Sequence, residues 1–492
     1  MKNSVTSFFI LLALLLVVPV FSQKGYKIKV KINNLKDTTL ILGHYFSDSK
    51  IVDDTITLDN KGSGIFKGKE PLPQGVYFIY LPTKSLFDII VGEDQDFSIE
   101  NDTIPTQLVE NLKIEGSQEN VLFKEYQLFL KQNRQKIISL NDSYKDTEDE
   151  KKKEKIREEI KEIHEKVKQK QKDFAEENPN TFFAAFVKAT LEVEVPDPPR
   201  DENGNIIDST WQYYYYRNHY FDNFPLNDDR LLRTPFYNDK VLNYVDRVIP
   251  QVPDSIKPEI DYLISQSRES NELFRNMLVN LFNHYAKNQV MGMDAVFFYI
   301  AEKYYIPEAS WSDSTFITKL KKELTEKGHL LIGNTAPDFE FVLVDAEHFI
   351  QAAEDTALAK NPHVGSFLKL HQVNADYTIL AFWESDCGHC KKTIPELYEL
   401  YQKLKSNNVA VISIHMIGGV EGKEKWIDFI NKYQLHDWIN GWNPYSYEYK
   451  KKYAINSTPV IFVLDKDKKI IAKRIAVEQA EEIINHYLKK KN

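Results

Sequence analysis

Two cysteines, Cys387 and Cys390, form a Cys-Gly-His-Cys motif and are the only thiols among the 492 residues. The apolar run Ala375–Trp383 before the motif predicts a buried strand, and Cys390–Leu404 has a helical pattern. The first sulfur is therefore expected at a helix start, where free N–H groups and the helix dipole favour a thiolate. The second sulfur lies one turn further on, close enough to attack a mixed disulfide at the first. This spacing predicts a redox-active disulfide that opens to a dithiol.

Side chains around the pair are expected to tune it. Gly388 and His389 separate the two cysteines, and a protonated His389 adds a cation near the thiolate of Cys387. The carboxylate of Asp386 at the rim raises the pKa of the same thiol and partly opposes this effect. The indole of Trp383 is expected to lie close to the pair and to shield it.

Three other uses of such a motif fit the sequence less well. A closed zinc site needs four ligands, and the chain has no second cysteine pair. Covalent haem attachment requires a histidine directly after the second cysteine, where Lys391 stands. A purely structural disulfide remains an alternative, although closing so short a loop stabilises a fold little. Thiol–disulfide exchange itself needs no metal and no organic cofactor.

Further stretches accompany the motif in the last third of the chain. They are Asn334-Thr335-Ala336-Pro337-Asp338-Phe339, Pro395, Thr458-Pro459, and Asp465-Lys466-Asp467 followed by Ile470. Together with the motif, they make residues 331–492 resemble the thioredoxin superfamily, specifically the TlpA/ResA-like thiol–disulfide oxidoreductases of bacterial envelopes. Strands and helices alternate through this segment, as in an α/β sheet.

This resemblance implies an α/β thioredoxin fold in which Cys387 attacks and Cys390 resolves. It implies a cis peptide bond between Thr458 and Pro459, facing the two sulfurs, with the backbone of Thr458 pairing with a client. Pro395 matches the proline that kinks the helix after the motif. Protein disulfides or dithiols are the implied clients, and a membrane-spanning thiol donor is the implied electron source.

Two positions depart from the family pattern. Ala381 stands six residues before the first cysteine, where thioredoxin has a buried aspartate, and Thr393 stands where many TlpA/ResA-like proteins have a glutamate. Both acids assist proton movement at the buried sulfur, and Glu384, Asp386 or Glu396 are candidates to replace them. Since Glu384 also occupies the place of a threonine typical of peroxiredoxins, a peroxidase remains only a weaker alternative.

The Cys-Gly-His-Cys motif also resembles that of protein disulfide isomerase. Potentials in this fold run from about −270 mV for thioredoxin to about −180 mV for the isomerase. A histidine that stabilises the thiolate stabilises the reduced form. We therefore expect a potential above that of thioredoxin, although the supply of reductant also sets the direction of electron flow.

Residues 1–22 have the pattern of a signal peptide. Lys2 is followed by the apolar run Phe8–Phe21, which is shorter than the ~20 residues of a membrane-spanning helix, and then by Ser22. An uncleaved anchor is the alternative. We expect an exported protein in the periplasm or cell envelope of a Gram-negative bacterium. The net charge of −9 argues against a nucleic-acid binder.

The remaining sequence predicts a multidomain α+β protein. Residues 23–116 have the alternating pattern and turn signals of an antiparallel β-sandwich-like domain, and residues 117–330 read as an all-helical domain. Residues 331–492 form the predicted thioredoxin-like domain. Ser117 is a candidate cap of the first helix, and Thr147 of the second, where Glu150 would complete a capping box.

Three features outside the motif have both a structural and a functional interpretation. The stripe Ile156, Ile160, Ile163 and Val167 on the second helix packs inside its own domain or forms a homodimer seam. The aromatic run Tyr213–Tyr216 packs against its own fold or stacks a ligand. His415 is interpreted as a strand-end histidine rather than an acid–base residue.

More than 300 residues precede the predicted redox domain, far more than dithiol chemistry needs. The second functional hypothesis is therefore an envelope binding or scaffold protein, whose thioredoxin-like domain recognises a client or partner.

Overall fold

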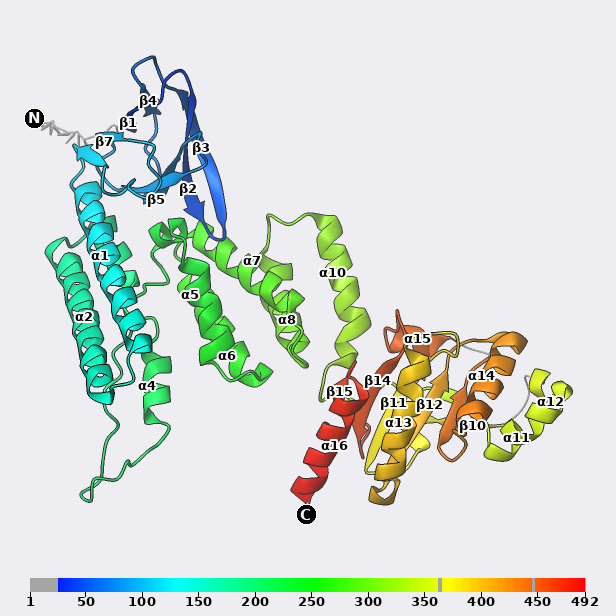
Figure 1. The fold of residues 1–492 in the computed structure, drawn as a ribbon. Helices are drawn as coiled ribbons and strands as arrows, with labels where there is room; N and C mark the ends of the chain where they lie inside the picture. Colours follow the sequence, from blue (N-terminus) through cyan, green and yellow to red (C-terminus); the bar gives the residue numbers. More distant parts are fainter. Residues whose placement is uncertain (1–24, 362–364, 445–446, 492) are drawn as a thin grey trace, which may run out of the picture. The chain divides into compact units, whose positions relative to one another are not determined.

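The computed structural model describes residues 25–361, 365–444 and 447–491, so the predicted signal peptide lies outside the described residues. The chain divides into two compact units, with the boundary between Tyr244 and Val245. Figure 1 labels strands β1–β5 and β7 and helices α1, α2, α4 and α5 in the first unit, and the main helices and strands of the second unit. This boundary falls inside segment 117–330, and the predicted domain limits stay a prediction.

Two four-stranded sheets open the first unit, in the orders β4-β1-β7-β8 and β3-β2-β5-β6. Alternate residues of β1 are buried in a core that both sheets share, while its lysines face solvent, as the period-2 pattern predicts. The predicted β-sandwich-like fold is confirmed, with one difference: β1 and β7 pair parallel. The strands are β1 (Lys27–Ile32), β2 (Thr39–Phe46), β3 (Ser49–Thr57), β4 (Ser63–Lys67), β5 (Gly75–Tyr80), β6 (Leu86–Val91), β7 (Asp96–Asn101) and β8 (Lys113–Glu115).

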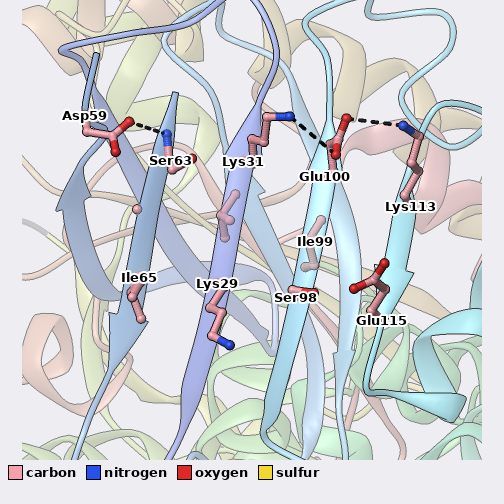
Figure 2. Close-up of a pocket in the computed structure, with 12 residues that line it drawn as sticks. Lys29, Lys31, Asp59, Ser63, Ile65, Ser98, Ile99, Glu100, Lys113 and Glu115 are labelled. Carbon is pink, nitrogen blue, oxygen red and sulfur yellow. Dashed lines mark hydrogen bonds and ion pairs between the residues drawn. The ribbon is translucent and has the colours of Figure 1, made fainter. Parts of the chain in front are cut away.

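The outer face of the first sheet forms a shallow pocket across β4, β1, β7 and β8 (Figure 2). The ammonium groups of Lys31 and Lys113 lie 3.6 and 3.2 Å from the carboxylate of Glu100. These cross-strand pairs of opposite charge contribute to sheet pairing.

Helices α1 (Gln118–Asp146), α2 (Glu150–Glu177), α3 (Phe182–Ala189), α4 (Trp211–His219) and α5 (Tyr237–Asn243) complete the first unit. Ser117 caps α1 as predicted, because its hydroxyl accepts the N–H of Asn120 at 3.4 Å. The apolar stripe of α2 is half-buried, and α2 packs against α1 and α3 of its own chain. This packing favours the intradomain interpretation of the stripe.

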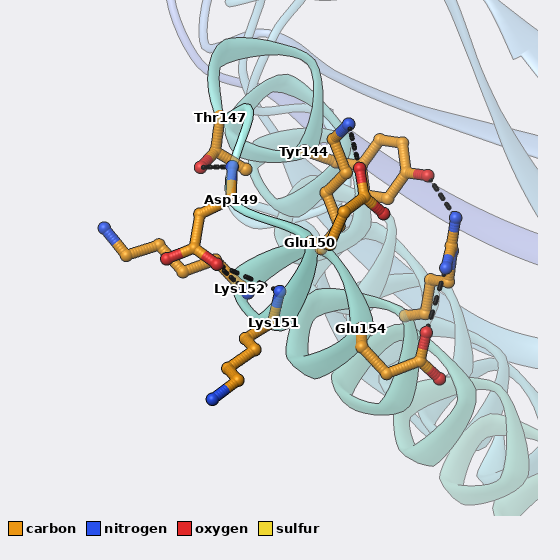
Figure 3. A network of polar contacts seen from close by, with 9 residues as sticks. Tyr144, Thr147, Asp149, Glu150, Lys151, Lys152 and Glu154 are labelled. Carbon is orange, nitrogen blue, oxygen red and sulfur yellow. Dashed lines mark hydrogen bonds and ion pairs between the residues drawn. The ribbon is translucent and has the colours of Figure 1, made fainter.

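The predicted cap of α2 is wrong. Thr147 ends α1, and Asp149 caps α2 by accepting the N–H groups of Lys151 and Lys152 at 2.9 and 3.4 Å (Figure 3). A carboxylate gains more than a hydroxyl at this position, because it also interacts with the positive end of the helix dipole. Glu150 is the first helical residue and does not complete the expected capping box.

The aromatic run lies on α4. The ring of Tyr215 stacks on Trp211 at 5.1 Å and on His219 at 4.1 Å between centroids. Tyr215 therefore already has a ring partner on each side along the helix. This arrangement favours packing within the fold over stacking of a ligand.

The second unit begins with helices α6 (Pro253–Gln266), α7 (Asn271–Lys287), α8 (Asp294–Ile300), α9 (Ile306–Glu308) and α10 (Ser314–Lys327). A seven-stranded sheet follows, in the order β10-β9-β13-β12-β11-β14-β15. Its strands are β9 (Glu340–Leu343), β10 (Ser366–Lys369), β11 (Tyr377–Trp383), β12 (Val409–His415), β13 (Ile439–Trp442), β14 (Val460–Asp465) and β15 (Ile470–Lys473). Strands β11, β12 and β13 are parallel, and the other pairs are antiparallel.

Helices cover both faces of this sheet. Residues of α13 (Cys390–Leu404), α14 (Gly419–Tyr433) and α16 (Val477–Lys491) share one core with Ala381 and Trp383 of β11. Phe382 faces the opposite core, with residues of α15 (Glu448–Lys452) and of the segment before β9. Two short helices, α11 (Ala346–Glu354) and α12 (Thr356–Lys360), lie between β9 and β10 in the chain and pack on α14. The predicted α/β domain is thus confirmed. Among the described residues, no helix combines the length and apolarity needed to cross a membrane.

Candidate active site

The two cysteines lie at the turn from β11 into α13, as predicted. Cys390 is the first residue of α13 and is buried, whereas Cys387 is half-buried in the turn before it. The N–H of Cys387 donates to the carbonyl of Glu384 at 3.2 Å, and the carbonyl of Cys387 accepts the N–H of Lys391 at 3.2 Å. These backbone bonds hold the partly exposed sulfur of Cys387 (the outer sulfur) before the N-terminus of α13. The buried sulfur of Cys390 (the inner sulfur) lies in its first turn. Both cysteines are free thiols.

The loop before β14 faces the outer sulfur. The thiol of Cys387 donates to the carbonyl oxygen of Thr458 at 3.3 Å, and the Thr458–Pro459 peptide is cis. The structure therefore brings together four residues that the sequence analysis grouped from two segments 68 or more positions apart.

The two thiols are electrostatically unequal. Burial alone would raise the pKa of Cys387, but hydrogen bonds from the Cys390 backbone and thiol, from Thr458 and from the His389 backbone hold that pKa below its ordinary value. Burial raises the pKa of Cys390 to about 12. A thiolate is the nucleophile in disulfide exchange, and the lower pKa makes Cys387 the more readily ionised of the two thiols.

The residues between and beside the cysteines are exposed. His389 reaches the sulfur of Cys387 through its backbone, while its side chain faces solvent. A Cβ at Gly388 would meet no atom within 4 Å, so no steric contact requires glycine there. The carboxylate of Asp386 lies 3.0 Å from the ammonium of Lys425 on α14, which offsets its repulsion of a thiolate at Cys387.

Trp383 ends β11 and is fully buried beside the pair. Its indole N–H donates to the hydroxyl of Ser413 at 2.8 Å, and its ring packs on Phe429 at 4.8 Å. Trp383 and Cys390 belong to the same hydrophobic core, and the shielding role of Trp383 stays a prediction. Pro395 lies inside α13, where it lacks the N–H that would continue the helical ladder.

Of the three candidate acids, Glu384 is the one that contacts the loop facing the sulfur. Its carboxylate accepts the hydroxyl of Thr458 at 3.4 Å. The carboxylate of Glu396 instead lies 3.7 Å from Lys392 on the exposed side of α13. Ala381 faces the same core as Cys390, so the place of the usual buried acid is apolar.

One residue of this region was not predicted to touch the motif. His415 lies at the end of β12, as expected, but its Nε2 accepts the N–H of Ser385 at 3.3 Å. The parallel register places His415 opposite Trp383, two residues before Ser385. The sequence pattern does not separate this register from others, because β12 has apolar residues at both odd and even positions and is buried on both faces.

Three family models match the chain. One is described as thioredoxin-like and covers residues 374–470. Two are described as domains of unknown function: DUF4369 covers residues 26–123, and DUF5106 covers residues 145–325. The thioredoxin-like match thus includes both cysteines, Cys387 and Cys390.

Individual proteins are also similar to parts of this chain. The thiol-disulfide oxidoreductase ResA of Bacillus thuringiensis is 28% identical over 172 residues, which are 34% of this chain and 81% of that protein. A crystallised domain of a possible thiol-disulfide isomerase from Cytophaga hutchinsonii is 32% identical, with a TM-score of 0.27, and covers 32% of this chain and 95% of its own. A thioredoxin-like protein from Bacteroides caccae is 19% identical, with a TM-score of 0.42, over 62% of this chain and 100% of its own.

Proposed function

Because the C-terminal part of the chain is a thioredoxin-like domain of the TlpA/ResA-like group, we propose that the protein exchanges electrons with protein disulfides through Cys387 and Cys390. The observation that carries this proposal is the pair of unequal thiols before Thr458, one with a lowered and one with a raised pKa. The protein is an oxidoreductase, and the residues named here are its proposed site.

In the reductive direction, the thiolate of Cys387 attacks one sulfur of a client disulfide. The client S–S bond breaks, one client sulfur leaves as a thiolate, and a mixed disulfide forms on Cys387. The client backbone lies along Thr458, whose carbonyl has lost its bond to the Cys387 thiol.

Resolution then falls to the buried sulfur. Cys390 loses its proton, attacks the sulfur of Cys387 and releases the second client thiolate, so that two electrons have passed to the client and the pair is a disulfide. Its raised pKa keeps Cys390 protonated until the mixed disulfide forms. Oxidation of a client dithiol follows the same steps in reverse.

The cellular setting extends this proposal. The signal-peptide pattern of residues 1–22 supports export to the periplasm or envelope of a Gram-negative bacterium. There the disulfide form is re-reduced by a membrane-spanning thiol donor. A homodimer through the helical part stays a prediction.

Insulin reduction tests the proposal directly. The wild-type chain should reduce insulin disulfides in the presence of a dithiol reductant, and Cys387→Ser should reduce them no faster than the reductant alone. Equal inertness of both proteins would contradict catalysis and support the binding or scaffold hypothesis. A circular dichroism spectrum of each protein controls for folding.

A further inference from the structure

His415 lies at the carboxyl end of β12, fully buried between aromatic rings. Its imidazole stacks on Trp426, with centroids 5.6 Å apart and an interplanar angle of 4°, and Trp383 approaches its face edge-on at 5.0 Å. Aromatic rings provide few hydrogen-bond partners for an imidazole, and a buried polar group without partners destabilises the fold. The polar contacts of His415 therefore require an explanation.

One nitrogen of the ring contacts the cysteine-bearing turn. Nε2 lies 3.3 Å from the backbone nitrogen of Ser385 and 3.1 Å from its hydroxyl. Since a backbone N–H can only donate, Nε2 must accept, and the ring proton therefore sits on Nδ1. Nδ1 is buried and has no hydrogen-bond partner among the described residues.

An unsatisfied buried N–H costs about 1–3 kcal/mol, so the imidazole is a poor choice for packing alone. A leucine or phenylalanine would fill such an apolar place without that cost. What the imidazole supplies, and an apolar side chain cannot, is the acceptor for Ser385.

Ser385 lies two residues before Cys387, inside the turn that aims the N–H groups of His389 and Cys390 at the outer sulfur. We infer that His415 is a positioning residue, which holds the Ser385 N–H and thereby fixes the sulfur of Cys387 against those N–H groups. This inference rests on the proposed function of the dithiol, and it assigns to the second parallel strand the support of a turn on the first.

The neutral ring suits this task. Burial lowers the pKa of His415 to about 3, so the ring remains an acceptor at every pH at which the dithiol works. A protonated ring would present an N–H to the N–H of Ser385 and lose the contact.

The experiment compares variants that keep or lose the acceptor. His415→Leu and His415→Phe lose it, His415→Gln places an amide oxygen where Nε2 stands, and Ser385→Ala keeps the backbone N–H as a matched control. In each reduced full-length protein, the pKa of Cys387 is measured by thiolate ultraviolet absorbance and by the pH dependence of alkylation at that residue.

Loss of the acceptor should raise the pKa of Cys387 by about one unit, which is roughly a tenfold loss of thiolate below that pKa. His415→Gln should restore most of the wild-type value, and Ser385→Ala should retain it. The variants without the acceptor should also have a less oxidising dithiol.

An unchanged Cys387 pKa in His415→Leu or His415→Phe, with only a lower melting temperature, would overturn the inference in favour of packing. A shift in Ser385→Ala as large as that in His415→Leu would overturn it as well, since the backbone N–H is intact there. If one apolar variant fails to fold, the other decides the outcome. The titration needs no client, so failure of the proposed function would show separately, as inert wild-type protein.

Discussion

The thiol of Cys387 lies 3.3 Å from the carbonyl oxygen of Thr458, the residue before cis Pro459. This contact, together with that between Glu384 and the Thr458 hydroxyl, joins the two segments of the proposed site. It occupies, in the free dithiol, the backbone group that would pair with a client. In the proposed mechanism, the Cys387 thiol must release the Thr458 carbonyl before a client pairs with it, which would couple attack to docking.

Replacing Cys390 should trap clients. In Cys390→Ser, Cys387 can still attack but no thiol can resolve the product, so mixed disulfides should accumulate. Non-reducing electrophoresis with mass spectrometry measures them. Cys387→Ser is the matched control, since its remaining thiol is buried, and equal trapping by both variants would contradict the assigned order of attack.

The two thiols should respond to pH separately. Because hydrogen bonds lower the pKa of Cys387, its thiolate persists at lower pH than that of a free cysteine, whose pKa is about 8.5. Cys390, with a pKa of about 12, should remain unreactive at neutral pH. Alkylation followed by peptide mapping across the pH range checks both statements. Faster alkylation of Cys390 than of Cys387 at neutral pH would refute them.

The dithiol should be more oxidising than that of thioredoxin. Stabilising the thiolate of Cys387 stabilises the reduced pair, which moves the potential above about −270 mV. A glutathione titration of the full chain measures the value. A potential at or below that of thioredoxin would mean that the lowered pKa does not control the equilibrium.

The ion pair between Asp386 and Lys425 should moderate the same thiol. Removing the ammonium in Lys425→Ala leaves a carboxylate beside Cys387, so the pKa of that thiol should rise. Both groups are partly exposed, and the shift should be only roughly a few tenths of a unit. The double variant Asp386→Asn/Lys425→Ala should cancel it. A fall in the Cys387 pKa in Lys425→Ala would disprove this account.

The positions of the dithiol and of the loop that faces it could be predicted, because both depend on short stretches of specific residue types. The spacing of Cys387 and Cys390 and the apolar run before them indicated a dithiol at a strand-to-helix turn, whereas the cis bond at Thr458-Pro459 was implied by the family resemblance. Strand β13 was not predicted, because its Asn440-Gly441 pair is a typical turn signal. In the fold, a Cβ at Gly441 would lie 2.5 Å from Ile414 and 2.7 Å from Phe341, so close packing explains the glycine.

Contacts between strands were beyond the reach of sequence patterns. His415 meets Ser385 only because β11 and β12 pair in the register that sets His415 beside Trp383. A strand that is buried on both faces encodes burial but only weakly encodes register, since apolar residues such as those of β12 stand at both odd and even positions. The strand β3 escaped prediction for a different reason: almost all of its residues are exposed, so it lacks a buried face.

Buried His415 should make the protein sensitive to acid. Its pKa is about 3 in the folded chain and about 6.5 when unfolded, so the unfolded state binds the extra proton between these values. The contribution of neutral His415 to the free energy of unfolding is therefore present above pH 6.5 and is lost as the pH falls towards 3. Between pH 7 and pH 5 the loss should be about 2 kcal/mol.

Urea unfolding of wild type and His415→Gln at both pH values measures this loss. The variant lacks the titrating group, so its stability should fall by about 2 kcal/mol less over the same interval, because every other titrating group is common to both proteins. Identical pH dependence in the two proteins would show that His415 has the same pKa in the folded and unfolded states, contrary to its burial and its contact with the Ser385 N–H.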